Sequence, residues 1–189
     1  MLPYFLFDLV EKSISEKEEE TFNVKLMIVS PNGKERKVLA AIQFIDDRDA
    51  RNVLMIMQPD WSKDSSRLFY ARLLTEGLYY IGSLNIDAGE AYAHLFSSAG
   101  SFSLSPDGKW IASLLKIKSK EILLNIARVD GTMQKYFKLD LEINEEALLP
   151  GPKASWSGDS KHILVPAKGV FGIIDTETGE MQKYSDPQH

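Results

Sequence analysis

Few side chains in this sequence stand at spacings that could support catalysis or metal binding. The three histidines, His94, His162 and His189, lie far apart, and none has a metal-ligand spacing from another histidine or from a carboxylate cluster. The sequence also lacks a Gly-x-Ser-x-Gly nucleophile elbow, and residues 100–103 lead directly into an apolar strand. We therefore expect no catalytic residue, no metal site and no cofactor.

Two charged stretches are candidates for contact with a partner. They contain Asp46, Asp47, Arg48 and Asp49 in one stretch and Lys116, Lys118 and Lys120 in the other. The aspartates could ligate calcium, but the Gly and Glu of a regular calcium loop are missing, which favours an exposed acidic turn. The lysines alternate along an extended segment and so point to one side, where they could meet an anionic partner; a solubilising loop is the alternative.

Composition excludes several classes of protein. The chain has 189 residues, 22 Lys and Arg against 27 Asp and Glu, and no cysteine. A formal charge of −5 gives no general attraction to nucleic acid, so no nucleic-acid partner is expected. Without cysteine there is no disulfide scaffold, no thiolate zinc site and no thiol nucleophile.

No segment of the sequence is long and apolar enough to span a bilayer, which takes about 18–20 residues. Residues 1–10 are apolar but contain Asp8 and have no basic leader, which favours a strand over a signal peptide. We expect a soluble protein without membrane insertion. Its compartment would be periplasmic or extracellular if a signal lies upstream, and cytoplasmic otherwise.

The elements that position these residues are repeated. Three segments share a large apolar residue, Ser, any residue, Asp and then an apolar strand, at intervals of about 40–50 residues: 61–69, 104–112 and 156–164. Their turns contain Ser62, Asp64, Ser105, Asp107, Gly108, Ser157 and Asp159. Because Ser and Asp side chains bond nearby backbone N–H groups and Gly permits positive φ, each segment predicts a tight hairpin in which these residues are structural.

A second turn follows each of these hairpins and contains Gly89, Gly131 or Gly179. Strand-like stretches precede it at 78–84, 122–129 and 170–174. Each unit therefore predicts four strands in two hairpins. The central strands are continuous apolar runs, which is typical of sheets covered on both faces.

A period of about 40–45 residues with four strands per unit is typical of a β-propeller, an all-β fold. The repeat resembles the WD-like repeat of the TolB family, which also forms the propellers of prolyl-oligopeptidase-type peptidases. The resemblance rests on SPDGK at 105–109, WS at 156–157 and TGE at 178–180, and covers approximately residues 59–184. It implies the fold more than the function, because such propellers have many roles and the peptidases carry their catalytic triad on a separate hydrolase domain.

The N-terminal third predicts a further, partial blade. Residues 24–34 match the second hairpin of the other units, with Asn-Gly at the turn. Residues 4–10 are expected to form the preceding strand, and the charged stretch 11–21 to form a solvated loop. This blade then lacks its innermost strand. Residues 37–57 form either an additional hairpin or an extended outer strand.

The chain thus predicts a single β-propeller domain or segment over 1–189, with blades at 1–58 (irregular), 59–99, 100–150 and 151–189. Three full blades and a partial one are at the lower limit of the about 4–8 that close a ring. We expect a fragment of a larger propeller, because exposed blade faces invite aggregation. The alternatives are a four-bladed ring and an open arc completed by self-association with another copy.

The repeated turns are expected to share one face of the propeller, and the irregular loops the opposite face. Because binding usually resides in variable loops, the opposite face is predicted to bind, with Asp46, Asp47, Arg48, Asp49, Lys116 and Lys118 as contacts. The expected function is a non-catalytic module that binds a protein or peptide. The alternatives are a substrate-gating propeller of a serine peptidase without its hydrolase domain, and a propeller enzyme that uses paired carboxylates.

Overall fold

The structure, a computed structural model, describes residues 5–14, 20–30, 32–44, 57–75, 78–98, 100–118, 121–141, 154–167 and 169–185. All regular elements in these ranges are β-strands. They are β1 (Phe5–Ile14), β2 (Glu20–Val29), β3 (Arg36–Phe44), β4 (Met57–Trp61), β5 (Arg67–Thr75), β6 (Leu78–Asn85), β7 (Ala91–Ser97), β8 (Phe102–Leu104), β9 (Trp110–Lys118), β10 (Glu121–Arg128), β11 (Gln134–Leu139), β12 (Ser155–Trp156), β13 (His162–Ala167), β14 (Val170–Asp175) and β15 (Met181–Ser185).

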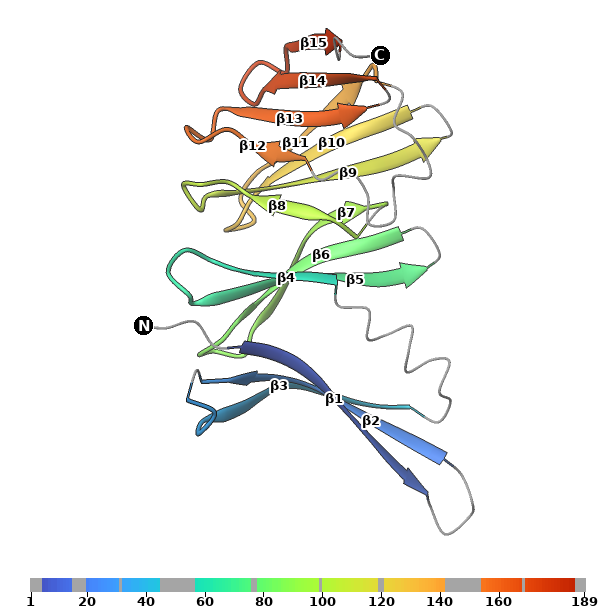
Figure 1. The fold of residues 1–189 in the computed structure, drawn as a ribbon, viewed down its shortest axis with the longest axis vertical. Helices are drawn as coiled ribbons and strands as arrows, with labels where there is room; N and C mark the ends of the chain where they lie inside the picture. Colours follow the sequence, from blue (N-terminus) through green and yellow to red (C-terminus); the bar gives the residue numbers. More distant parts are fainter. Residues whose placement is uncertain are drawn as a thin grey trace.

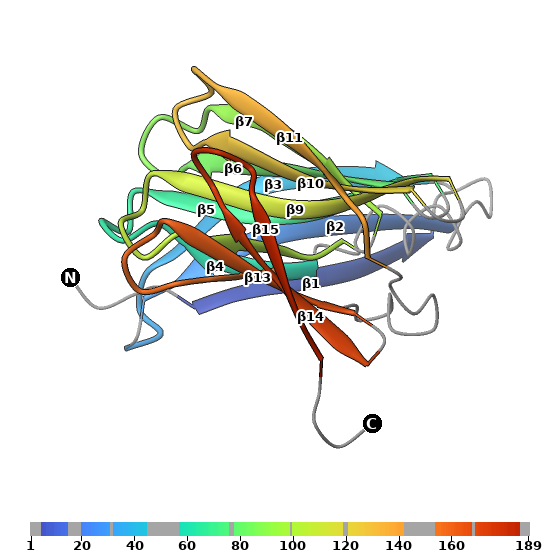
Figure 2. The ribbon, with the colours of Figure 1, turned by 90° about the horizontal axis from the view of Figure 1, so that it is seen from above.

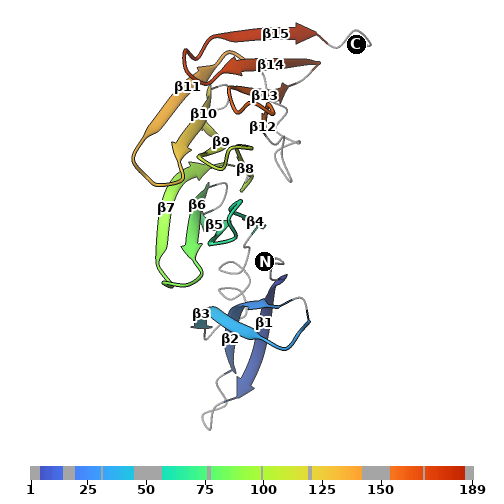
Figure 3. The ribbon, with the colours of Figure 1, turned by 90° about the vertical axis from the view of Figure 1, so that its left-hand side faces the viewer.

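The strands form four antiparallel sheets in which chain neighbours pair. We call these sheets blade 1 (β1–β3), blade 2 (β4–β7), blade 3 (β8–β11) and blade 4 (β12–β15). Figure 1 shows the blades stacked in chain order, and Figure 3 shows β4, β8 and β12 on one side of the row and β7 and β11 on the other. Stacked four-stranded meanders are the blades of a β-propeller, so the predicted all-β propeller fold, with three full blades and one partial blade, is confirmed.

The core lies between the blades. In β9, Ile111 is fully buried in a cluster with Phe69 and Ala71 of blade 2. Its neighbour Ala112 is buried in a different cluster, with Ile163 of blade 4. Successive side chains of a strand point to opposite faces, so the continuous apolar run of β9 serves two junctions at once. This is the burial on both faces that the sequence predicts.

Blade 1 joins the stack in the same way as the complete blades. Lys37 on β3 pairs with Ile28 on β2, and its Nζ donates to the carbonyl of Ile86, the first residue after β6. In blade 3, Lys135 pairs with Ile126, and its Nζ donates at 3.1 Å to the carbonyl of the first residue after β14. The β2–β3 hairpin is therefore a second hairpin, as predicted, and the described part of blade 1 lacks the innermost strand.

The charged stretch 11–21 was predicted to be a loop, and this prediction is wrong at both ends. β1 continues to Ile14 and β2 begins at Glu20, with Lys12 paired to Phe22. In Figure 1, β1 and β2 run away from blade 2 toward the bottom of the picture, and their backbones pair through residues that the charge pattern assigned to a loop. Within 37–57, the structure shows an outer strand, β3, up to residue 44; residues 45–56 lie outside the described ranges.

Candidate binding groove on the turn face

Each complete blade closes its first hairpin with the same six-residue turn. In blade 3, the Ser105 N–H donates to the Trp110 carbonyl, and the Gly108 N–H donates to the Ser105 carbonyl. The Ser105 hydroxyl donates to Asp107 at 2.6 Å and accepts from the Trp110 N–H at 2.9 Å. The same pairing joins Ser62 to Asp64 in blade 2 and Ser157 to Asp159 in blade 4. The repeat residues therefore build the turns themselves.

These hydrogen bonds hold the aspartates in the ionised form. The Ser62 hydroxyl, followed by the N–H and hydroxyl of Ser66, lowers the pKa of Asp64 to about 2. The pKa of Asp159 is lowered by the Ser157 hydroxyl and then by the Lys161 N–H. A carboxylate that accepts several hydrogen bonds is favoured over its protonated form. Protonation of these aspartates at low pH should therefore weaken the turns.

One position of the turn requires positive φ. Gly108 has φ of 73°, and the corresponding Ser65 and Ser160 have 59° and 61°. The Ser160 hydroxyl also accepts from the Asp107 N–H at 3.1 Å, which joins the turns of blades 3 and 4. The repeated turns thus form a continuous surface, the turn face, which lies on the left in Figure 2.

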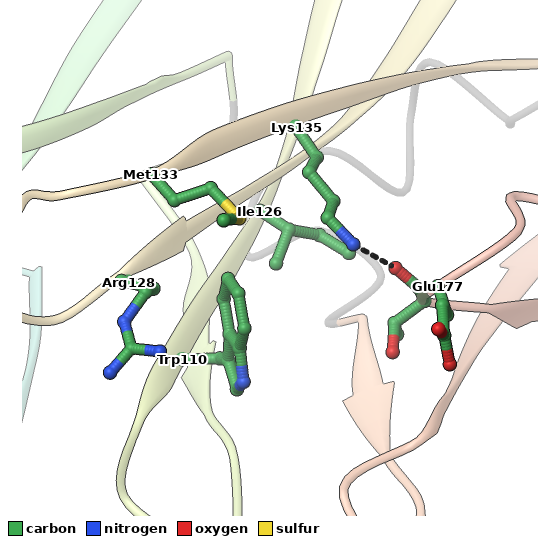
Figure 4. Close-up of a pocket in the computed structure, with 7 residues that line it drawn as sticks. Trp110, Ile126, Arg128, Met133, Lys135 and Glu177 are labelled. Atoms are coloured by element: carbon green, nitrogen blue, oxygen red, sulfur yellow. Dashed lines mark hydrogen bonds between the residues drawn. The ribbon is translucent and has the colours of Figure 1, made fainter.

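A groove of about 300 Å³ opens on the turn face between blades 3 and 4 (Figure 4). It is lined by Trp110, Ile126, Arg128, Met133, Lys135, Thr176 and Glu177, and we call it the Trp110 groove. The lining comes from β9, β10 and the turn and strand that follow β10, together with the turn after β14. The groove therefore forms only where three strands of blade 3 pack against a turn of blade 4.

Trp110 is the centre of this groove. The Arg128 guanidinium lies 5.4 Å and the Lys135 ammonium 5.9 Å from its ring centroid, so the indole lies between two cations. Lys135 also donates to the Thr176 carbonyl at 3.1 Å, which fixes the lysine across the junction. Met133 is 45% exposed beside them. The groove thus combines the apolar surfaces of Trp110 and Met133 with the charges of Arg128 and Lys135.

A second groove, of about 360 Å³, lies on the same face between blades 2 and 3. It is lined by Ser62, Lys63, Asp64, Ser66, Arg67, Phe69, Asp107, Gly108 and Val129. Arg67 begins β5 as Trp110 begins β9, so each groove contains the first residue of the second strand of a blade. The second groove contains no indole, and Phe69 and Val129 supply apolar side chains to its lining beside the turn aspartates and Arg67.

The structure describes only two of the contacts predicted from sequence. Asp46, Asp47, Arg48 and Asp49 are outside the described residues. Lys116 and Lys118 lie at the end of β9 that points away from the turn face, where the Lys116 N–H donates to the Ser98 hydroxyl at 2.8 Å. The structure brings neither lysine to the Trp110 groove.

Sequence reasoning missed Arg128, Met133 and Lys135, which flank the turn after β10. A signal was available, because Trp110 occupies the repeat position held by Arg67 and His162. A large aromatic residue directly after a turn marks a junction that differs from the others. The repeat did not indicate that Glu177, far along the chain, would line the same groove as this indole.

The described residues also contain a hydrogen-bonded serine and histidine that the sequence pattern did not predict. Ser83 Oγ lies 2.8 Å from His94 Nε2, and both side chains are buried between blades 2 and 3. Burial, followed by the charge of Arg67, lowers the pKa of His94, so the ring is neutral. The pair is buried in the junction and joins β6 to β7.

Within the described ranges, no three or more His, Asp or Glu side chains gather where they could hold a metal ion. The same ranges contain no helix of the length and apolar character needed to cross a membrane.

Comparison with known proteins gives structural relatives only. No family model and no curated protein matches the sequence. The structure is similar to TolB from Acinetobacter baumannii, with a TM-score of 0.56, 15% identity, and coverage of 95% of this chain and 42% of that one. It is also similar to the propeller domain of the Trilobed protease from Pyrococcus furiosus, with a TM-score of 0.56, 12% identity, and coverage of 98% and 58%.

An oligogalacturonate lyase solved with manganese is a further structural relative, with a TM-score of 0.53, 13% identity, and coverage of 89% of this chain and 46% of that one. The chain thus spans about half the length of these structures. Their identities are too low to transfer a function, and their printed activities differ from one another. What the geometry and these relatives share is the architecture: this chain has the β-propeller fold.

Proposed function

We propose that this β-propeller module has no catalytic role of its own and binds a protein or peptide at the Trp110 groove. The observation that carries the proposal is the half-buried indole of Trp110, held between Arg128 and Lys135 in a groove of about 300 Å³. Aromatic side chains, Met and Arg are enriched in the centres of protein interfaces, and a fixed groove costs little entropy when a segment enters it.

The lining also indicates what kind of segment would fit. Trp110 and Met133 offer apolar contact to one side chain of an extended peptide. Lys135 and Arg128, whose Nε also donates to Asp130 at 3.1 Å, lie close enough to the indole to meet a carboxylate or carbonyl group next to that side chain. Glu177, on the blade 4 side of the groove, suits a donor. A peptide with an apolar residue beside an acidic one is therefore the expected ligand.

The opposite face, with Lys116, Lys118 and residues 46–49, is the alternative site that the sequence predicts. Two exposed side chains distinguish the faces. Met133, 45% exposed, lines the Trp110 groove, whereas Ile117, 49% exposed, lies between the two lysines. Lysine in place of either residue adds one charge at a similar exposure, so the two variants are matched.

The test is selection of peptides from a random display library on the wild-type protein, followed by fluorescence anisotropy with the best labelled peptide. We expect Met133→Lys to raise the Kd at least tenfold, about 1.4 kcal/mol or more, and Ile117→Lys to leave it within twofold. The reverse result would assign binding to the opposite face. If the library yields no specific peptide, the peptide-binding proposal is wrong.

A second candidate is a substrate-gating propeller that acts beside the hydrolase domain of a serine peptidase. The likeness to the Trilobed protease propeller domain favours it. It requires a domain with a Gly-x-Ser-x-Gly elbow in the parent reading frame, because the catalytic serine has to come from there. Sequencing of the genomic region around this chain tests it, and a reading frame without such a domain rejects it.

A further inference from the structure

The junctions between blades are made by residues at fixed register positions. On blade 3, Ala112 pairs with Ile126 and Leu114 pairs with Leu124. All four are buried in the cluster that blade 3 shares with blade 4. Directly opposite residues of antiparallel strands point to the same side, so these side chains form one face of the blade.

Blade 4 repeats this face at the end of the row. Leu164 pairs with Ile173, and Pro166 pairs with Phe171. Ile163, next to Leu164 in β13, points the other way and is buried against blade 3. The four paired residues thus point away from blade 3, and within the described part of the chain no further blade covers them.

The uncovered surface is apolar and ordered. Phe171 stacks on Tyr184 of β15, with ring centroids 5.2 Å apart and planes at 13°. The Tyr184 hydroxyl donates to Gln182 at 2.6 Å, which fixes the ring. Leu164 is 39% and Tyr184 42% exposed, although the corresponding side chains of blade 3 are covered. We call Leu164, Pro166, Phe171, Ile173 and Tyr184 the open face of blade 4.

Blade 1, at the other end of the row, presents the complementary side of a junction. Lys37 points toward blade 2, because its Nζ donates to the Ile86 carbonyl. Arg36 and Val38 flank Lys37 in β3 and so point away from blade 2. Arg36 is exposed, and Val38 is 47% exposed. Met27, which pairs with Val38 and points to the same side, is only 9% exposed, so the apolar exposure on this side of blade 1 is that of Val38.

Arg36 also occupies a strand position whose counterpart in blade 3 forms a hydrogen bond to the preceding blade. In blade 3, the residue before Lys135 is Gln134, and its Nε2 donates to the His94 carbonyl in the preceding blade. Arg36 precedes Lys37 in the same way. Its guanidinium can donate to a backbone carbonyl of whichever blade packs on blade 1.

From these observations we infer that two copies of this chain join end to end. The open face of blade 4 in each copy packs on the side of blade 1 that carries Arg36 and Val38 in the other. Two copies supply twice the four sheets of one chain, which agrees with the upper end of the about 4–8 blades of closed propellers. The two contacts are equivalent under a twofold axis, so the ring closes.

The new junction would also form a further groove on the turn face. His162 pairs with Asp175 at the start of β13, where blade 3 has Trp110 paired with Arg128. The partner copy would complete the lining there, as blade 4 completes the Trp110 groove.

Sedimentation velocity of the full chain at micromolar concentrations tests the inference. We expect twice the monomer mass for the wild type, and at least a tenfold higher dimer dissociation constant for Leu164→Lys and for Tyr184→Lys. The control is Tyr136→Lys, since Tyr136 is 57% exposed on an outer strand and its hydroxyl also donates to the glutamine two residues earlier. A monomeric wild type, open-ended polymers, or Tyr184→Lys dimers as stable as the wild type would overturn the inference.

Discussion

Asn32 shows which property of the turn aspartates matters for folding. In the β2–β3 turn, the Ser30 hydroxyl donates to Asn32 Oδ1 at 2.6 Å, and the Lys34 N–H donates to the same atom at 3.0 Å. These are the bonds that Asp64 and Asp107 accept in the other blades. An amide oxygen is therefore a sufficient acceptor, and the charge of the aspartate is not required.

Asp64→Asn should keep the turn and remove part of the acid sensitivity of the protein. The pKa of Asp64 is lowered from 3.8 to about 2 in the folded state, so the unfolded chain binds a proton more readily. Its contribution to stability is then complete above about pH 4 and is lost as the pH falls toward 2. Urea unfolding between pH 2 and 5 should show a flatter pH dependence for the variant.

The control for this measurement is Asp87→Asn, a substitution in the exposed turn after β6. It should leave the pH dependence of the wild type unchanged. The interpretation of the turn is wrong if both variants flatten the curve equally, or if Asp64→Asn unfolds the protein at pH 7.

At the scale of the strand, two glycines differ in the space around them: Gly82 lies in a packed strand and Gly158 in an open turn. A Cβ on Gly82 in β6 would lie 2.8 Å from the Tyr80 ring and 3.0 Å from the Tyr92 carbonyl. A Cβ on Gly158 would meet no atom within 4 Å. Gly82→Ala should therefore destabilise the protein by about 1–3 kcal/mol through overpacking. Gly158→Ala should stay within about 0.5 kcal/mol.

Chemical denaturation of the two variants side by side measures this difference. Equal stabilities would show that β6 relaxes around the added methyl group, and that the close approach of Tyr80 does not constrain the strand.

The strands and turns could be predicted because their signals are local. Ser, Asp and Gly of one turn lie within six residues, and the apolar run of β9 is continuous. The Trp110 groove could not be predicted, since Glu177 comes from a turn far along the chain. Nor could the Ser83 and His94 pair, which depends on a register shift between Ile81 and Gly82. Contacts across a junction depend on register, which a repeat pattern leaves open.

Across the whole molecule, the two junctions between complete blades differ in polarity. The junction between blades 3 and 4 is filled mainly by aliphatic side chains. The junction between blades 2 and 3 also buries Ser83, His94 and Asn125, and Asn125 donates to the Phe96 carbonyl at 3.1 Å. Buried polar groups contribute less net free energy than apolar packing, so this junction should open first.

Acid should weaken the same junction selectively. Burial lowers the pKa of His94 below its ordinary 6.5, so the unfolded chain takes up a proton first as the pH falls. The contribution of neutral His94 is complete above pH 6.5 and is lost as the pH falls through the folded pKa. Hydrogen exchange of β7, corrected for intrinsic rates, should accelerate between pH 7 and 5 more than that of β14.

His94→Gln is the matched variant, because its amide can still bond Ser83 but does not titrate in this range. It should remove the difference between β7 and β14. Equal acceleration of both strands in the wild type would contradict the assignment to His94.

The self-contained turns have a consequence for evolution. Apart from the bond between Asp107 and Ser160, the repeated Ser and Asp of the turns make their hydrogen bonds within six residues, and they depend little on which apolar side chains fill the blades behind them. Descendants of such a gene can exchange most of their core while the hairpins keep forming in place. Duplication or loss of a whole unit then changes the number of blades while each remaining blade keeps its fold. The turn sequences should therefore be the best markers of common ancestry among such chains.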